Sequence, residues 1–168
     1  MKTIYLLRHA KSGWDDAVSR DFDRPISAKG KRGAVLMGQH LRHQAIDFGR
    51  VIASPAVRCV ETVEYLEQGF GQALEPIYDP HLYLASAEQL LDVIQAQSDQ
   101  YDKIMLIGHN PGLEDLVLLL VPEVQADQLS NQLREKIEAK FPTAAIATIE
   151  LAIDQWQEAG SSLVQVKD

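Results

Sequence analysis

The amino-acid sequence predicts an α/β fold, a three-layer α/β/α arrangement in which helices flank a mostly parallel sheet. Two observations support this prediction. Apolar runs of strand length occupy residues 2–7, 50–53, 103–107 and 144–152. Stretches with apolar residues at helical spacing separate the first three runs, and this alternation is typical of the strand–helix units that build parallel sheets.

Two basic side chains directly follow the apolar run of the first strand. Residues Ile4 to Leu7 read as a buried strand, and Arg8 and His9 follow it directly. Because burying an arginine is costly unless an anion accompanies it, this boundary predicts an anion-binding site at the end of the strand.

A helix is expected after the first strand. Ser27 can act as its N-cap, and the helical pattern runs to about Ala45. The face that should pack on the sheet contains Ala34, Met37, Gly38, Leu41 and Ala45.

The stretch "VIASPAVRCVETVEYL" predicts the second strand and the helix that follows it. Ser54 is expected as the N-cap and Pro55 as the first helical residue. Arg58 lies in the first turn or so, off the buried stripe that includes Ala56, Cys59, Val63 and Leu66.

The second half of the chain repeats this pattern. Ser86 and Gln89 predict a capping box for a helix to about Gln95. An apolar strand, a polar turn and a helix follow in "DKIMLIGHNPGLEDLVLLLV", and residues 123–140 predict a mostly solvated helix. The tail, with Trp156, Gly160 and Val164, predicts a last hairpin strand at the edge of the sheet.

Length and composition restrict the possible functions. A chain of 168 residues fits one domain spanning residues 1–168, and its formal charge of -8 argues against a general affinity for nucleic acid or an anionic membrane. Any anion site must therefore be local.

The expected location of the protein follows from its cysteine content and its N-terminus. The only cysteine, Cys59, can form no internal disulfide, and the N-terminus fits neither a secretory signal nor a transmembrane helix. We therefore expect a cytoplasmic protein.

Three strand ends carry the polar residues of interest. These are Arg8 and His9, the segment 54–58 and the segment 108–111. Because ligands of open parallel sheets bind at the carboxyl ends of the strands, we expect these segments to converge. Helix N-termini following Ser54 and Asn110 would direct N–H groups toward a phosphate, and two arginines could bind its oxygens.

Two histidines in these segments predict that the site is catalytic and does not only bind phosphate. Arginines near His9 should lower its pKa and keep the ring neutral and nucleophilic, so that it can attack phosphorus. His109 can donate a hydrogen bond to the equatorial oxygens in the transition state.

The motifs "LLRHA", "SPAVRCVET" and "GHNPG" resemble those of the histidine phosphatase superfamily, whose fold is phosphoglycerate mutase-like. The short chain and the stretch "DFDRPISAKG" resemble its SixA-type phosphohistidine phosphatases. The resemblance implies that His9 is phosphorylated during turnover and that Arg8, Arg58 and His109 form the phosphate pocket. It implies no metal and no other cofactor.

The chain departs from the family pattern in two respects. Many members have glycine where this chain has Ala10, a change that should be tolerated if the backbone there needs no positive φ. The interval between Arg58 and His109 has no room for the large cap insertion of longer relatives. The pocket should therefore be open and able to admit a phosphorylated side chain of another protein.

The general acid is the least defined part of the site. Members that act on alcohol phosphates usually supply an acidic residue, for which Asp21 or Asp23 are candidates here and Glu88 a weaker one. An imidazole leaving group, whose conjugate acid has a pKa of about 6.5, needs less help than an alkoxide. This favours phosphohistidine on a carrier or signalling protein as the substrate.

Several alternatives remain open at this stage. The pocket could serve a phosphomonoesterase acting on a small phosphorylated metabolite, or a non-catalytic module that binds a phosphoprotein. Arg58 could be a surface arginine paired with Glu61 or Thr62, and His109 a structural turn residue. His40 and His43 are one helical turn apart, but no carboxylate or cysteine cluster completes a metal site with them.

Overall fold

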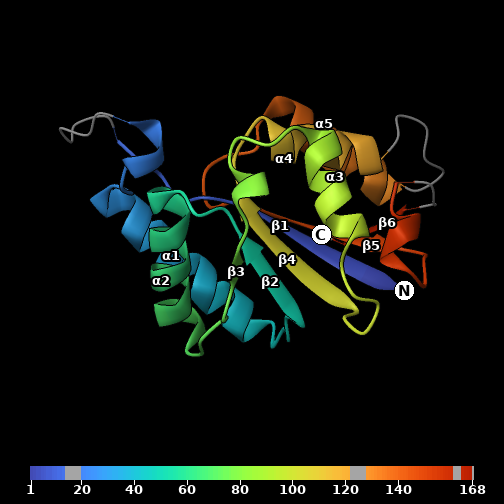
Figure 1. Ribbon diagram of the computed structural model, residues 1–168, viewed down its shortest axis with the longest axis horizontal. Coiled ribbons are helices and arrows are strands. Elements are labelled where there is room, and N and C mark those ends of the chain that lie inside the picture. The colour runs from blue at the N-terminus through green and yellow to red at the C-terminus, as the bar shows by residue number, and fades with distance from the viewer. Residues whose placement is uncertain (14–19, 122–127, 161–163, 168) are drawn as a thin grey trace.

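The computed structural model describes residues 1–13, 20–121, 128–160 and 164–167. Short 3₁₀ turns lie at Asp21–Asp23, Pro80–Leu82 and Trp156–Glu158. The helices and strands (Figure 1) are β1 (Lys2–Arg8), α1 (Ala28–His43), β2 (Arg50–Ala53), α2 (Val57–Phe70), β3 (Ile77–Tyr78), α3 (Ala87–Gln95), β4 (Lys103–Gly108), α4 (Gly112–Leu120), α5 (Gln128–Ala139), β5 (Ile146–Leu151) and β6 (Val164–Lys167).

The strands form one sheet in the order β3-β2-β4-β1-β5-β6. Strands β1 to β4 are parallel to one another, and β5 runs antiparallel to β1. The predicted α/β fold with a mostly parallel sheet is therefore confirmed. Arg8 at the end of β1 pairs with Gly108 at the end of β4, so both strands end at the same edge of the sheet.

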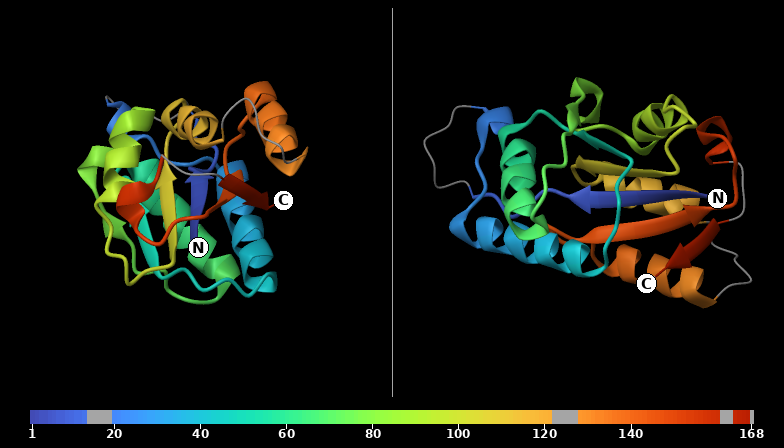
Figure 2. Two further views of the ribbon diagram at one scale, coloured as in Figure 1. Left: turned by 90° about the vertical axis from the view of Figure 1, so that its right-hand side faces the viewer. Right: turned by 90° about the horizontal axis from the view of Figure 1, so that it is seen from below.

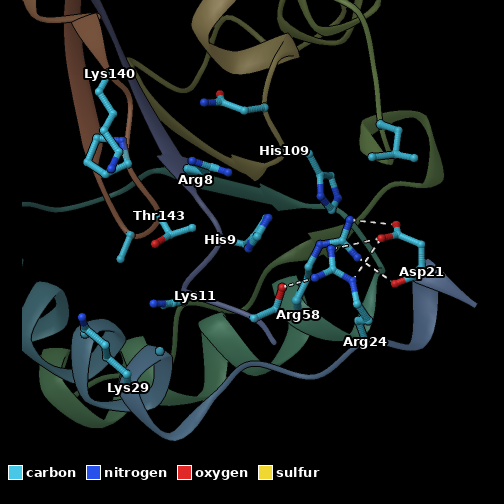
Figure 3. A pocket seen from close by; sticks show the side chains of 17 residues that line it. Arg8, His9, Lys11, Asp21, Arg24, Lys29, Arg58, His109, Lys140 and Thr143 are labelled. Atoms are coloured by element: carbon cyan, nitrogen blue, oxygen red, sulfur yellow. Dashed lines mark hydrogen bonds and ion pairs between the residues drawn. The ribbon is translucent and has the colours of Figure 1, made fainter. Parts of the chain in front are cut away.

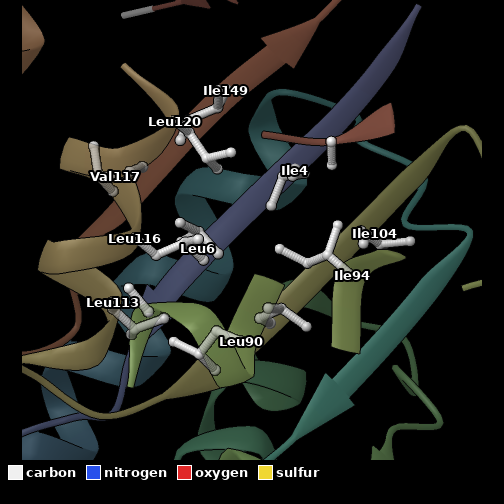
Figure 4. Packing of buried hydrophobic residues seen from close by; sticks show 14 of the residues in the cluster. Ile4, Leu6, Leu90, Ile94, Ile104, Leu113, Leu116, Val117, Leu120 and Ile149 are labelled. Carbon is white, nitrogen blue, oxygen red and sulfur yellow. The ribbon is translucent and has the colours of Figure 1, made fainter. Parts of the chain in front are cut away.

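Helices cover both faces of the sheet (Figure 2). Because side chains alternate along a strand, Ile4 and Leu6 of β1 pack with α3 and α4, while Tyr5 and Leu7 pack with α1 and α2. Figure 4 shows Ile4 and Leu6 next to the apolar residues of α4. Both faces of β1 are thus buried, which explains why its sequence is an uninterrupted apolar run.

The helices α1 and α2 approach each other closely at two glycines. A Cβ built on Gly69 would overlap the carbonyl oxygen of Val35, and one built on Gly38 would overlap that of Leu66. The two backbones touch at this crossing, so neither position can hold a larger residue without moving the helices.

Two of the three predicted helix caps are confirmed. The Ser27 hydroxyl accepts a hydrogen bond from the Gly30 N–H at 3.1 Å, and Ser86 and Gln89 form both bonds of the capping box. The third prediction was wrong, because α2 begins at Val57 and not at Pro55. The Ser54 hydroxyl lies 2.8 Å from a ring nitrogen of His109 and so takes part in the site below.

The C-terminal region follows the prediction in part. The strand expected over residues 144–152 is observed as β5, and β6 is the expected edge strand. Trp156 does not belong to that strand. Its indole is fully buried and donates a hydrogen bond to the Tyr101 carbonyl at 2.8 Å, which holds it in a 3₁₀ turn.

The helix expected over residues 123–140 is observed as α5, although residues 122–127 lie outside the described part of the chain. The two-residue strand β3 was not predicted. Within the described ranges, no helix is long and apolar enough to cross a membrane.

Candidate active site

The three predicted strand ends converge on one cavity of about 720 Å³ (Figure 3). Arg8 and His9 reach it from the end of β1, Arg58 from the first turn of α2, and His109 from the turn after β4. The rings of His9 and His109 lie 5.4 Å apart between their centroids. Residues up to 101 positions apart in the sequence thus share one pocket, because the parallel strands end at the same edge.

The His9 ring is held in a defined orientation. Its Nδ1 lies 2.7 Å from the Ala10 carbonyl oxygen, which can only accept a hydrogen bond. Nδ1 therefore carries the proton, and Nε2 keeps a free lone pair. The backbone is fixed as well, since the His9 N–H donates to the Gly108 carbonyl and the Ala144 N–H to the His9 carbonyl.

Ala10 fits its position without backbone strain. It is fully buried, its N–H donates to the Thr62 hydroxyl at 2.9 Å, and its φ is not positive. The replacement of the glycine common in related proteins therefore has no conformational cost here.

Both histidines are neutral at neutral pH. Burial, and then the positive charges of Arg58, Arg8 and Arg24, lower the pKa of His9 to about 4 despite the opposing hydrogen bond to Ala10. Burial, followed by the charge of Arg58, lowers the pKa of His109 to about 3. The sequence prediction attributed the lowering to the arginines, whereas burial is the larger cause.

His109 is packed from behind by two small side chains. Its Nε2 lies 2.8 Å from the Ser54 hydroxyl and 3.6 Å from the Cys59 sulfur. Burial raises the pKa of the Cys59 thiol to about 12, so the sulfur stays protonated. Neither residue lines the cavity, so Nε2 faces away from it. The other ring nitrogen, Nδ1, is buried and has no hydrogen-bond partner in the described residues.

The two motif arginines are anchored by different segments. Arg8 donates from Nη1 to the Phe141 carbonyl at 2.9 Å, and Arg58 donates from Nη1 to the Asp21 carbonyl at 2.8 Å. Arg58 is 2% exposed, so it is not the surface arginine that a pair with Glu61 would have required. The Nε atoms of both arginines are buried without a partner in the described part of the chain.

Asp21 accepts hydrogen bonds from three side chains. The Tyr83 hydroxyl lies at 2.7 Å, Arg58 Nη2 at 3.0 Å and Arg24 Nη2 at 3.0 Å from its carboxylate oxygens. Burial alone would raise the pKa of Asp21, but the bonds from Tyr83 and Arg58 outweigh it and lower the pKa to about 2. Asp21 is therefore a carboxylate at neutral pH.

The other two candidate acids lie elsewhere. Asp23 forms a salt bridge with Arg20 at 2.8 Å, and Glu88 is exposed at the start of α3. Neither of them lines the cavity. Sequence reasoning missed Tyr83, which no local pattern marks, and Arg24, which the quoted stretch "DFDRPISAKG" contains. Within the described residues, no three or more His, Cys, Asp or Glu side chains come together to form a metal site.

Comparisons with known proteins agree with this geometry. The model of the histidine phosphatase superfamily (branch 1) matches residues 4–109. An uncharacterized protein of Mycobacterium leprae is 30% identical over 155 residues, which cover 90% of either chain. A phosphohistidine phosphatase SixA homolog of Haemophilus influenzae is 26% identical over 123 residues, 68% of this chain and 74% of that protein.

Among solved structures, a protein of Agrobacterium tumefaciens provisionally assigned as phosphohistidine phosphatase SixA superposes with a TM-score of 0.80 at 26% identity. The superposition covers 99% of this chain and 96% of that one. The likeness thus extends over the whole length of both chains, including the region beyond His109 that the family model leaves unmatched.

Proposed function

The chain belongs to the histidine phosphatase superfamily, on its SixA-like branch, and we propose that it removes the phosphoryl group from phosphohistidine on a protein. The observation that carries the proposal is His9. Its ring is neutral, its Nε2 has a free lone pair, and it lies in a cavity with the half-buried Arg8 and the buried Arg58. That is what a nucleophile toward a phosphoryl group requires.

The reaction would proceed in two displacements at phosphorus. In the first, the lone pair of His9 Nε2 forms a bond to phosphorus, while the bond from phosphorus to the substrate nitrogen breaks and its electron pair stays on the leaving imidazole. The imidazole takes a proton from solvent. In the second, a water molecule attacks phosphorus, the bond to His9 breaks, and inorganic phosphate leaves with the ring neutral again.

Arg8, Arg58 and His109 would bind the phosphoryl oxygens in both steps. The arginines line the cavity and supply fixed positive charge. His109 would act as a neutral donor. If the Ser54 hydroxyl donates to Nε2, the ring proton resides on Nδ1, and Nδ1 is the atom left to bind a phosphoryl oxygen.

We assign Asp21 a positioning role in place of the general-acid role that its sequence suggested. A carboxyl group with a pKa of about 2 has no proton to give at neutral pH, and this one holds Arg58 and Arg24 instead. A site without a strong acid favours a leaving group that is weakly basic, such as the imidazole of phosphohistidine.

The shape of the site supports a protein substrate. Between Arg58 and His109 the chain forms α2, β3, the 3₁₀ turn Pro80–Leu82, α3 and β4 with short connections, and no large insertion covers the cavity. The names of the SixA relatives point in the same direction. The partner would be a cytoplasmic carrier or signalling domain phosphorylated on histidine, acted on by one catalytic domain formed by residues 1–168 and needing no cofactor.

Phosphate release from a histidine-phosphorylated carrier protein and from an aryl phosphate tests the proposal. We expect turnover of the carrier, its loss in His9→Ala and its retention in the control His43→Ala, which changes an exposed histidine at the end of α1. Cleavage of the aryl phosphate alone would establish a phosphomonoesterase of small metabolites. If phosphate is released from neither substrate, the protein is a module that binds a phosphoprotein without hydrolysing it.

A further inference from the structure

Three lysines at the mouth of the cavity have no role in the chemistry proposed above. Lys11 follows β1, Lys29 lies in the first turn of α1, and Lys140 follows α5. All three line the cavity and are exposed, and no ion pair to a described residue is recorded for any of them. Figure 3 shows them on the side of the cavity away from Asp21. We call them the lysine rim.

The lysine rim gives the mouth a charge opposite to that of the whole protein. Six arginine and lysine side chains line the cavity against the single carboxylate of Asp21, in a chain whose formal charge is -8. That carboxylate is already paired with Arg58 and Arg24. The phosphoryl group itself needs only Arg8 and Arg58, so the lysine rim is positive charge available for the rest of the substrate.

An apolar side chain borders the same mouth. Leu84 lines the cavity and is 56% exposed, next in sequence to Tyr83, whose hydroxyl bonds to Asp21. Its φ of 49° is in the left-handed region, which a branched side chain rarely adopts. Backbone held in this way occurs preferentially at functional sites, and an exposed leucine there suits contact with another protein.

We infer that the lysine rim and Leu84 form a docking surface for the acidic surface of a protein phosphorylated on histidine. This inference rests on the proposed function and adds what the partner must carry, namely carboxylates beside the phosphohistidine. Lysines are flexible point charges that suit carboxylates at variable positions, whereas a small polyanion is held better by the planar fork of arginine. Leu84 has nothing to contribute to a small polyanion.

Two synthetic phosphohistidine peptides test the inference. They are identical except that the residues flanking the phosphohistidine are Asp and Glu in one and Asn and Gln in the other. We expect the wild type to have a kcat/KM about tenfold higher for the acidic peptide, as three exposed ion pairs would give. Added salt should remove this ratio, because it screens exposed charges.

Variants of the full chain test whether the lysine rim causes the preference for the acidic peptide. Replacing Lys11, Lys29 and Lys140 together by Gln should bring the ratio of the two kcat/KM values to about one, and each single variant should lower it partway. The control Lys103→Gln makes the same change at an exposed lysine at the opposite end of β4 and should leave the ratio unchanged. Leu84→Ala should lower both values by the same factor.

The outcomes separate the inference from the proposed function. Equal kcat/KM for the two peptides in the wild type, or a ratio that survives in the triple variant, would overturn the docking surface alone. A triple variant that loses more activity on fructose 1,6-bisphosphate than on the acidic peptide would reassign the lysine rim to a small polyanion. Hydrolysis of an aryl phosphate without hydrolysis of either peptide would overturn the proposed function and the inference with it.

Discussion

The Arg58 guanidinium contacts Asp21 at two points, with Nη2 3.0 Å from the carboxylate Oδ2 and Nη1 2.8 Å from the backbone carbonyl oxygen. Two bonds fix both the position and the plane of the guanidinium. The arginine proposed to bind the phosphoryl group is thus oriented by a residue outside the motif that contains it.

This contact predicts the effect of Asp21→Asn. Loss of the negative charge should lower kcat/KM about tenfold for phosphohistidine and for an aryl phosphate alike, because Arg58 serves both substrates and the carboxylate is partly exposed. Steady-state kinetics on both substrates measures this. Asp23→Asn, outside the cavity, is the matched control. A loss confined to the aryl phosphate would return Asp21 to the role of general acid.

The two active-site histidines should stay neutral well below pH 6.5. With pKa values of about 4 for His9 and about 3 for His109, their rings should not titrate between about pH 8 and pH 5 in proton spectra. A midpoint near 6.5 for His9 would show that the ring is solvated, contrary to its burial.

The same two pKa values make the stability of the fold depend on pH. The folded-state values lie below the unfolded value of about 6.5, so the unfolded chain takes up protons first as the pH falls. Stability is complete above about pH 6.5 and should drop by about 2 kcal/mol for each histidine by about pH 5. Urea unfolding at both pH values measures the drop, and His109→Asn should show a smaller one. An equal drop in that variant would place its cause in other groups.

Ser54→Ala tests the proposed tautomer of His109. In the wild type, the proton should reside on Nδ1, as long-range ¹H–¹⁵N spectra of the ring can show. Without the Ser54 hydroxyl the preference should weaken, and kcat should fall about tenfold, as for other residues that orient a functional histidine. Ser98→Ala changes an exposed serine as a control. A proton found on Nε2 in the wild type would reject the assignment.

The helix crossing predicts opposite effects at two glycines. Gly69→Ala should destabilise the fold by about 2 kcal/mol or more, because its Cβ meets the Val35 carbonyl and the backbones must separate. A Cβ on Gly33, which lies in α1, meets nothing within 4 Å, so Gly33→Ala should stabilise by about 0.5–1 kcal/mol through helix propensity. Thermal unfolding distinguishes the two, and destabilisation by both would mean that the crossing is not specific.

The features predicted correctly from the sequence depend on residues close together in the chain. The abrupt change from Leu7 to Arg8 locates the edge of the sheet, and Ser27 and Ser86 cap helices through bonds to residues three positions away. The failures have distant causes. Ser54 does not cap a helix because its hydroxyl meets His109, and Trp156 leaves the predicted edge strand because its indole bonds to Tyr101.

The residues of the site also divide into those that local motifs predict and those that only the fold brings together. The motifs indicated Arg8, His9, Arg58 and His109, and the structure brings these four together in one cavity. Tyr83 could not be found, because only the folded chain brings its hydroxyl to a carboxylate 62 residues away. The dominance of burial over charge in lowering the pKa of His9 likewise depends on packing that no local pattern reveals.

The anchoring of Arg8 by the Phe141 carbonyl has a consequence for synthesis of the chain. All four motif residues have been added to the chain once residue 109 has been made, yet Phe141 and Ala144, which bond to Arg8 and His9, are added more than 30 residues later. The strand β5, which pairs with β1 along its other edge, comes later still. A nascent chain therefore carries the catalytic motifs well before it can hold them in place, and activity should appear only after β5 has been made.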